Sequence, residues 1–284
     1  MSYIVYISIF LCLLNLGLGR IGPTNINVYD LELSLLSNAV SQITDKNDLK
    51  DYSATYVKTK VGAVKIYRPK IFRSIRDSLS ITDQNFIVNL LPDRLICVNP
   101  DSKSGQRFWI SSDGLIVLKT LKHYEAKNLQ AILDQYANHV LTSEHSAIAS
   151  VLGLYRVKLP GHLFSKYYLV SRNAFPMLGS KDSYIHSKYD LKGSSVGRIA
   201  SSKSSVKKDV DLTRSGRLLY LGESKPLFLK TLENDLLFLQ RETFMDYSLL
   251  VSVEECSAKH LRRFPVTKRN HKFGSSAPED RYVI

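Results

Sequence analysis

Two short segments contain the residues of this chain that are best suited to chemistry. Residues 189–194 read Tyr-Asp-Leu-Lys-Gly-Ser, and residues 245–250 read Met-Asp-Tyr-Ser-Leu-Leu. Each places charged side chains in a short apolar frame, with Asp190 and Lys192 in the first segment and Asp246 in the second. A carboxylate can orient an attacking hydroxyl and accept its proton, and a lysine can stabilise a transferred phosphoryl group. Together the two segments indicate phosphoryl transfer.

The first segment also has the features of an anion-binding loop. Gly193 follows Lys192, so backbone N–H groups there can approach an oxyanion closely. Arg198 comes shortly afterwards and can add a bidentate contact to phosphate. The alternative is that Asp190 caps a turn and that Lys192 is solvated. We take Lys192, Asp190 and Asp246 as candidate catalytic residues, and Lys192 and Arg198 as candidate substrate-binding residues.

Residues 102–120 contain the best candidate for a nucleotide site. Ser104 and Gly105 lie in a polar loop, and residues 115–120 are predicted to form a strand after a Ser-Ser-Asp-Gly turn. Alternation along this strand places Lys119 on its apolar face, where an ammonium group needs an anion or a route to water. An ATP phosphate would satisfy Lys119, with the amides of the glycine loop above it. The alternative is a lysine at the end of a strand that reaches solvent.

Glu125 follows Lys119 on a predicted helix. An ion pair between the two side chains would orient the lysine. The alternative is a glutamate exposed on the surface of the helix.

The remaining periodic segments supply the elements that must position these residues. Helical spacing predicts one helix after Pro69, a second after Thr82, and a long helix after Pro226 that leads to Asp246. Two apolar runs within residues 151–170 predict a further hairpin. The long helix is expected to bury one apolar stripe and to carry its charged residues elsewhere, Glu233 and Asp235 among them; the stripe comprises Phe228, Leu229, Leu232, Leu236 and Leu239.

The composition favours a globular protein with phosphate-rich partners. The chain has 284 residues, of which 44% are hydrophobic and 23% charged, so one large or two-lobed domain is expected. Lys and Arg number 39 against 26 Asp and Glu, which gives a formal charge of +13. This bias suits nucleic acid or the anionic cytoplasmic leaflet. No aromatic-basic motif supports nucleic-acid binding, and no nucleic-acid partner is expected.

The cysteines indicate neither a disulfide framework nor a zinc site. Cys12, Cys97 and Cys256 form no CxxC pair, and only His260 lies near any of them. A reducing compartment is therefore favoured, and no residue is assigned as a metal ligand.

The chain divides into three parts. Residues 1–23 are largely apolar at the start, and a signal peptide without a basic leader, a short membrane anchor and a wrongly assigned gene start all remain open. Residues 24–60 form a poorly defined polar segment whose leucines indicate a short helix or a strand without deciding between them. Residues 61–284 form the core.

In their order, spacing and residue identities, these motifs resemble those of the phosphatidylinositol phosphate kinases, which phosphorylate the inositol ring of a membrane lipid with ATP. The resemblance covers most of residues 65–255 and rests mainly on residues 189–194 and 245–250. It implies an α+β, two-lobed lipid-kinase-like fold, with an antiparallel sheet in an amino-terminal lobe that ends near Phe175 and an incomplete carboxyl-terminal lobe. The family's Lys-Ser-Gly loop and Ile-Lys-Thr strand correspond here to residues 103–105 and 118–120.

The resemblance also implies residue roles. Asp246 would orient the attacking hydroxyl, Lys119 and Glu125 would form the ion pair at the phosphates, and Asn173 would lie at the hinge beside adenine. One of the two paired asparagines of the family's hinge is replaced by Arg172.

Two further departures concern the lipid and the metal. Ile199 follows Arg198 where the family often has a second arginine. The family also holds Mg²⁺ with the aspartate of an Ile-Ile-Asp motif, which does not occur before Ile284. We expect this ligand beyond Ile284, in a fragment or truncated gene product; a natural pseudokinase is the alternative.

The resemblance therefore implies ATP-dependent phosphorylation of a phosphatidylinositol phosphate, by family frequency the 4-phosphate to the 4,5-bisphosphate. The alternative is a catalytically inactive scaffold that binds ATP or phosphoinositides. The expected partners are ATP, Mg²⁺ and a phosphoinositide in an anionic membrane, with a homodimer left open. The expected location is cytoplasmic and peripheral, at the inner face of the plasma membrane, and the hydrophobic start leaves membrane anchoring open.

Overall fold

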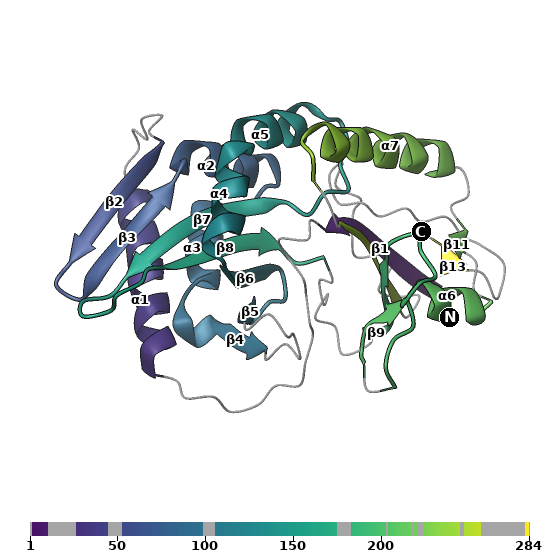
Figure 1. Ribbon diagram of the computed structural model, residues 1–284, viewed down its shortest axis with the longest axis horizontal. Coiled ribbons are helices and arrows are strands. Elements are labelled where there is room, and N and C mark those ends of the chain that lie inside the picture. Colours follow the sequence, from purple (N-terminus) through teal and green to yellow (C-terminus); the bar gives the residue numbers. More distant parts are fainter. Residues whose placement is uncertain are drawn as a thin grey trace. The chain divides into compact units, whose positions relative to one another are not determined.

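Two units make up the fold, and each contains its own β-sheet (Figure 1). The larger-sheet unit comprises Leu16–Thr142 and Ser150–Asn173, and the smaller-sheet unit comprises Met1–Asn15, Ser143–Ala149 and Ala174–Ile284. This mixture of helix and sheet confirms the predicted α+β class, whereas the division into kinase lobes stays a prediction. The computed structural model describes residues 2–10, 27–44, 53–98, 106–174, 183–202, 204–216, 219–220, 224–244, 247–256 and 282–283.

The larger sheet is antiparallel throughout. In the described part of the chain its strands follow the order β2-β3-β7-β8-β6-β5-β4. Their bounds are β2 (Ala54–Thr59), β3 (Gly62–Tyr67), β4 (Leu95–Val98), β5 (Phe108–Ser111), β6 (Ile116–Leu121), β7 (Val151–Lys158) and β8 (Lys166–Arg172).

Two predicted hairpins of this sheet are confirmed. β5 and β6 are joined by a turn in which Gly114 has a φ of 73°. β7 and β8 are joined through Pro160 and Gly161, and Gly161 has a φ of 74°. Glycine suits both positions because a left-handed conformation strains residues that have a Cβ atom.

Two helices of the larger-sheet unit begin at the residues that the sequence predicts. Pro69 occupies the first turn of α2, and the Thr82 hydroxyl caps α3 by accepting the N–H of Asn85 at 3.2 Å. The helical bounds are α1 (Asn27–Thr44), α2 (Pro69–Ser78), α3 (Asp83–Asn89), the 3₁₀ turn η2 (Pro92–Arg94), α4 (His123–Ala131) and α5 (Leu133–Thr142).

The helix α1 is attached to the sheet by a polar and aromatic cluster. Glu32 is buried and accepts hydrogen bonds from the Tyr168 hydroxyl at 2.6 Å and from Lys166 Nζ at 3.0 Å. The centroid of the Tyr29 ring lies 4.0 Å from Lys166 Nζ and 5.6 Å from the centroid of the Trp109 ring. The leucines that left helix and strand undecided therefore belong to a packed helix, and Leu33, Leu35 and Leu36 are all buried.

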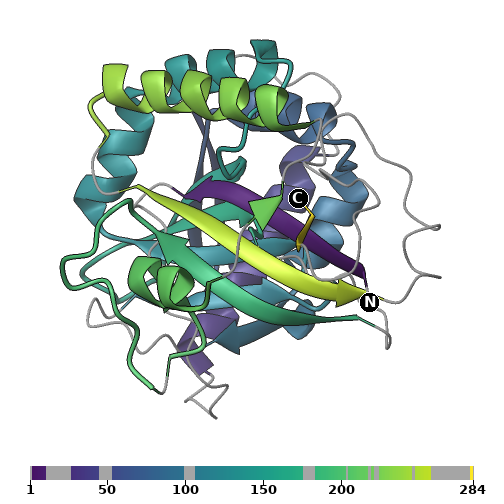
Figure 2. The same cartoon turned by 90° about the vertical axis from the view of Figure 1, so that its right-hand side faces the viewer.

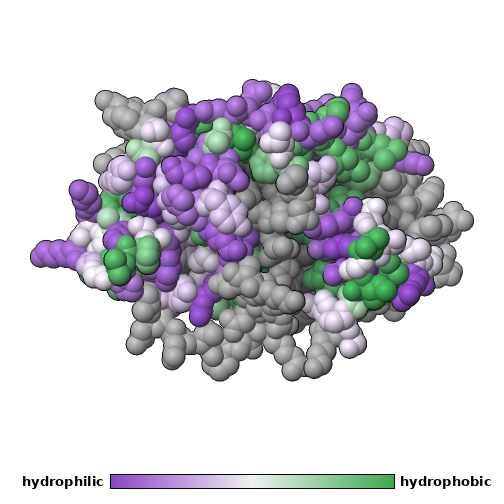
Figure 3. All heavy atoms as spheres, in the orientation of Figure 1, coloured by the Kyte–Doolittle hydropathy of each residue, from purple (hydrophilic) through white to green (hydrophobic). Residues whose placement is uncertain are grey.

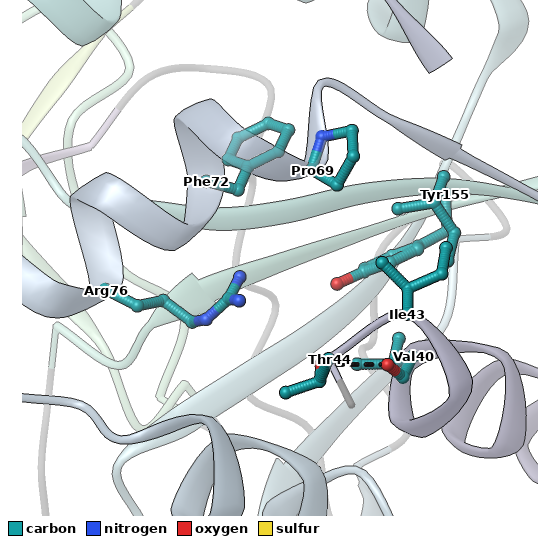
Figure 4. Close-up of a pocket in the computed structure, with 8 residues that line it drawn as sticks. Val40, Ile43, Thr44, Pro69, Phe72, Arg76 and Tyr155 are labelled. Atoms are coloured by element: carbon teal, nitrogen blue, oxygen red, sulfur yellow. Dashed lines mark hydrogen bonds between the residues drawn. The ribbon is translucent and has the colours of Figure 1, made fainter. Parts of the chain in front are cut away.

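α1 and α2 line a small pocket over strands β3 and β7 (Figure 4). Arg76 and Tyr155 point toward each other across this pocket, and burial raises the pKa of Tyr155 to about 12. Arg76 also donates to Asp83 at 2.9 Å and to the Leu152 carbonyl at 3.1 Å, which ties α2 to α3 and β7. The rest of the lining is mostly apolar and comprises Val40, Ile43, Thr44, Ile66, Pro69 and Phe72.

The smaller sheet has the order β1-β12-β9-β10 among the described residues, and Figure 2 shows its three long strands side by side. β12 pairs antiparallel with β1 and β9, whereas β10 pairs parallel with β9. The bounds in this unit are β1 (Ser2–Phe10), β9 (Ser183–Leu191), β10 (Lys207–Lys208), α6 (Asp209–Arg214), α7 (Lys225–Arg241) and β12 (Ser248–Cys256), with β11 (Leu219–Tyr220) paired to β13 (Tyr282–Val283).

The long predicted helix is α7, and its buried face differs in part from the prediction. Phe228 and Leu239 are buried as expected, and Phe228 packs on Tyr189 and other residues of the smaller sheet. Leu229, however, is 48% exposed, and Asp235 is completely buried. The prediction that Asp235 lies away from the buried face is therefore wrong: its carboxylate accepts hydrogen bonds from the Ser146 hydroxyl at 2.9 Å and the Ala147 N–H at 2.6 Å, and these bonds offset the cost of its burial.

The apolar start of the chain contributes the strand β1, which pairs with β12 from Ser2 to Phe10. None of the helices in the described ranges has the length and apolar character needed to span a bilayer.

Candidate functional site

Lys119 is completely buried in an interior strand of the larger sheet. Lys119 lies in β6, its cross-strand neighbours are Phe108 of β5 and Leu169 of β8, and its Nζ lies 5.3 Å from the centroid of the Phe108 ring. On the same face, Val117 packs with Phe108 and Val98 in an apolar cluster. The apolar placement predicted for Lys119 is therefore confirmed, and the alternative of a lysine that reaches solvent is wrong.

Glu125 lies near the start of α4 and is only 8% exposed, so the alternative of an exposed glutamate is also wrong. Its carboxylate accepts the N–H of Lys122 at 2.6 Å and the side-chain amide of Gln106 at 2.5 Å. Glu125 thus caps its own helix and holds the segment just before β5. The ion pair with Lys119 stays a prediction.

Asn173 fastens the end of β8 to the turn between β5 and β6. Its backbone N–H donates to the Leu115 carbonyl at 2.8 Å, and its side-chain amide donates to the Gly114 carbonyl at 2.8 Å. Since Asn173 is 7% exposed, these bonds fix the backbone at the point where the larger-sheet unit ends.

The loop after β9 contains Lys192 and Gly193, and both of its candidate anion-binding amides contact a carboxylate of the protein. The N–H groups of Lys192 and Gly193 donate to Asp209 Oδ1 at 2.9 and 2.8 Å. Gly193 has a φ of 70°, which a residue with a Cβ atom adopts only at a cost. The loop therefore has the conformation of an anion-binding turn, but its anion is Asp209.

Arg198 completes this arrangement through two ion pairs. Its Nε donates to Asp209 Oδ2 at 2.7 Å, and its Nη2 donates to Asp190 Oδ1 at 3.0 Å and also to the Asp190 carbonyl. The Arg198 side chain is 12% exposed. We define Asp190, Lys192, Gly193, Arg198 and Asp209 as the loop-bracing cluster.

The charge of Asp209 is stabilised within this cluster. Burial alone would raise the pKa of Asp209, but the hydrogen bonds from Arg198 and from the two amides outweigh it and hold the pKa below its usual range. Asp209 was not among the residues predicted from sequence. The signal that could have found it is its place at the first position of α6, where carboxylates are favoured.

The structure brings some of the predicted residues together. Asp190, Lys192 and Arg198 belong to one cluster in the smaller-sheet unit, and Lys119, Glu125 and Asn173 all lie in the larger-sheet unit. Ser104, Gly105 and Asp246 lie outside the described residues, so their roles stay predictions. The described ranges contain no group of three or more His, Cys, Asp or Glu side chains that could hold a metal ion.

Comparison with known proteins gives one family. Residues 93–281 match the family model described as Phosphatidylinositol-4-phosphate 5-Kinase. The human phosphatidylinositol 5-phosphate 4-kinase type-2 gamma is 35% identical over 67% of this chain and 45% of its own length. The human type-2 beta protein is 32% identical over 72% of this chain and 50% of its own length.

A plant protein, phosphatidylinositol 4-phosphate 5-kinase 9 of Arabidopsis thaliana, is 35% identical over 70% of this chain and 24% of its own length. The chain thus spans no more than half the length of these relatives. The relatives' names differ in the ring position that is phosphorylated, but they agree on the class of protein. Because the family model matches more than half of the chain, the chain belongs to the phosphatidylinositol phosphate kinase family.

Proposed function

We propose that this chain transfers a phosphoryl group from ATP to a hydroxyl of the inositol ring of a phosphatidylinositol phosphate. The observation that carries the proposal is the complete burial of Lys119 on the apolar face of an interior strand, in a chain of this family. A lysine in such surroundings interacts strongly with a phosphate because water does not screen the charges.

The larger-sheet unit would bind the nucleotide. Lys119 would contact the phosphates, with Ser104 and Gly105 covering them from the preceding loop. The apolar cluster of Val98, Phe108 and Val117 lies on the same face of the sheet as Lys119 and would pack against the purine ring. Asn173 would hold the backbone that meets adenine, since its own side chain is engaged with the Gly114 carbonyl.

Three other residues would serve the transfer itself. Asp246 would orient the attacking hydroxyl and accept its proton, and Lys192 would stabilise the transferred phosphoryl group. Asp190 would keep Arg198 in place rather than contact substrate, because the two side chains form an ion pair. Mg²⁺, when bound with ATP, would neutralise charge on the phosphates, and no described residue is assigned as its ligand.

Phosphatidylinositol 4-phosphate is the proposed substrate, with the 4,5-bisphosphate as its product. The relatives' names include both 5-phosphate 4-kinases and a 4-phosphate 5-kinase, so both ring positions require testing. The chain would be incubated with radiolabelled ATP, Mg²⁺ and vesicles that contain either the 4-phosphate or the 5-phosphate. Chromatography of the deacylated headgroups would then identify the product.

Variants test the residue assignments. We expect Lys119→Met to weaken ATP binding and transfer together, and Asp246→Asn to abolish transfer while ATP binding remains. Lys127→Met, on an exposed position of α4, is the matched control and should change neither. Unchanged turnover in Asp246→Asn would refute the proposal. Vesicle binding without any transfer by the unmodified chain would instead favour the scaffold alternative.

A further inference from the structure

Two large apolar side chains protrude from the turn between β7 and β8. Leu163 is 88% exposed and Phe164 is 84% exposed. Adjacent apolar residues at this level of exposure are unusual on a soluble surface and indicate a contact with another apolar phase or partner.

The turn between β2 and β3 lies beside it at the same end of the larger sheet. Ala63 pairs with Lys158, and a Cβ atom built on Gly62 would lie 2.7 Å from the Lys158 carbonyl oxygen. The second turn adds Val61, which is 50% exposed, together with the exposed Lys58 and Lys60. Figure 3 shows hydrophobic atoms surrounded by hydrophilic ones toward this end of the unit, at the left.

Both hairpins carry charge of one sign. Residues 53–67 and 150–173 include no Asp or Glu. Their basic residues are Lys58, Lys60, Lys65, Arg156, Lys158, Lys166 and Arg172. Lys166 is engaged with Glu32 of α1, but Lys58 and Lys60 are exposed at the turn. A surface that combines protruding apolar residues with unbalanced positive charge is complementary to an anionic bilayer.

Two carbonyl groups of the β7–β8 turn already have a hydrogen-bond donor within the protein. Lys158 Nζ donates to the carbonyls of His162 and Leu163, the latter at 2.7 Å. Carbonyl groups without a partner are costly to remove from water, so these contacts lower the cost of burying the turn.

We infer that these two turns, residues 59–62 and 159–165, form a membrane-docking tip. Leu163 and Phe164 insert at the boundary between headgroups and acyl chains, while Lys58 and Lys60 face the lipid phosphates. This inference deepens the proposed function, because the proposed substrate lies in a bilayer, but its test requires no catalysis.

The test is sedimentation of the 284-residue chain with phosphatidylcholine vesicles, with and without phosphatidylserine and in every case without phosphoinositide. We expect the double variant Leu163→Ser/Phe164→Ser to lose about tenfold or more in vesicle affinity, since burying one such side chain is worth about that factor. Leu237→Ser, on a 57% exposed position of α7, is the matched control and should keep the affinity.

The charge contribution is tested separately. Lys58→Gln/Lys60→Gln should weaken binding only to vesicles that contain phosphatidylserine. Lys127→Gln/Lys230→Gln removes the same net charge from exposed helix positions and should have the smaller effect. In a Phe164→Trp variant, brominated lipids should quench more fluorescence than in the unmodified chain if the tip inserts.

Equal vesicle affinity in the Leu163→Ser/Phe164→Ser variant, or no added quenching in Phe164→Trp, would overturn the docking tip. A change from dimer to monomer in that double variant without lipid would overturn it as well, in favour of contact between copies of the chain. Transfer to a water-soluble short-chain phosphoinositide separates the two proposals. Its absence together with tip-dependent vesicle binding would refute only the proposed kinase function, and its presence without such binding would refute only the tip.

Discussion

The carboxylate of Asp209 lies against the guanidinium of Arg198, with 2.7 Å between Oδ2 and Nε. The other oxygen of this carboxylate accepts the backbone N–H groups of Lys192 and Gly193. One side chain therefore holds both the turn that carries Lys192 and the arginine that pairs with Asp190. This relationship makes Asp209 a positioning residue for the proposed transfer of phosphate.

We predict that Asp209→Asn lowers kcat by about tenfold to a hundredfold while the KM for ATP stays the same. The amide keeps the shape but loses the charge that strengthens three hydrogen bonds, and charge-assisted bonds are each worth about 1.5–3 kcal/mol. Steady-state kinetics with a phosphoinositide substrate would measure the change.

Asp211→Asn is the control for this prediction, because Asp211 lies in the same helix as Asp209 and also accepts two backbone hydrogen bonds. Its Oδ2 accepts the N–H groups of Ala200 and Lys208, at 2.9 Å each. If both variants lose thermal stability and activity alike, Asp209 has only a structural role.

The ionised carboxylate of Asp83 should contribute to stability in a way that depends on pH. Burial alone would raise its pKa, but hydrogen bonds from Arg73 and Arg76 outweigh it and lower the pKa in the folded state. Its contribution to stability is therefore complete at pH values above the ordinary aspartate pKa of about 3.9. The contribution is lost as the pH falls from there through the lowered pKa of the folded state. We expect Asp83→Asn to cost about 2 kcal/mol of unfolding free energy at pH 7.

Urea unfolding at pH 7 and at pH 3 would check this prediction. The difference between Asp83→Asn and the unmodified chain should shrink at pH 3, whereas Asp77→Asn, at an exposed position of α2, should show little difference at either pH. A difference that is the same at both pH values would rule out the ionised carboxylate as its source.

Removing the buried carboxylate of Asp235 should cause a larger loss of stability than the change at Asp83. We expect Asp235→Ala to lower the unfolding free energy by about 3 kcal/mol, because it leaves the buried N–H of Ala147 and the hydroxyl of Ser146 without this acceptor. Asn234→Ala, on the exposed face of the same helix, should cost much less. Comparable losses in the two variants would show that helix propensity, and not the buried carboxylate, decides the outcome.

Much of the larger sheet could be predicted from local pattern. Alternation and turn chemistry were sufficient for both hairpins, and the same alternation placed Lys119 on the buried face of its strand. Pro69 and Thr82 marked two helix starts because their effects are local to one turn.

The rest depended on contacts that local pattern does not contain. Asp235 was assigned to a polar face because its partners, Ser146 and Ala147, come from a distant segment. Asp209 was missed because the N–H groups of Lys192 and Gly193, whose hydrogen bonds it accepts, lie on the other side of an intervening loop. The helix α1 was left undecided because it is fixed by Glu32 and aromatic contacts with strands much later in the chain.

The cluster that attaches α1 to the sheet contains the only tryptophan in the sequence, Trp109, which lies between Tyr29 and Tyr168 with centroid distances of 5.6 and 6.2 Å. Its fluorescence therefore reports on one unit of the protein alone. Far-ultraviolet circular dichroism, by contrast, observes the backbone of both. Melting curves followed by the two signals would coincide if the units unfold cooperatively and would separate if they unfold independently. The chain thus carries a built-in optical probe of how strongly its two units depend on each other for stability.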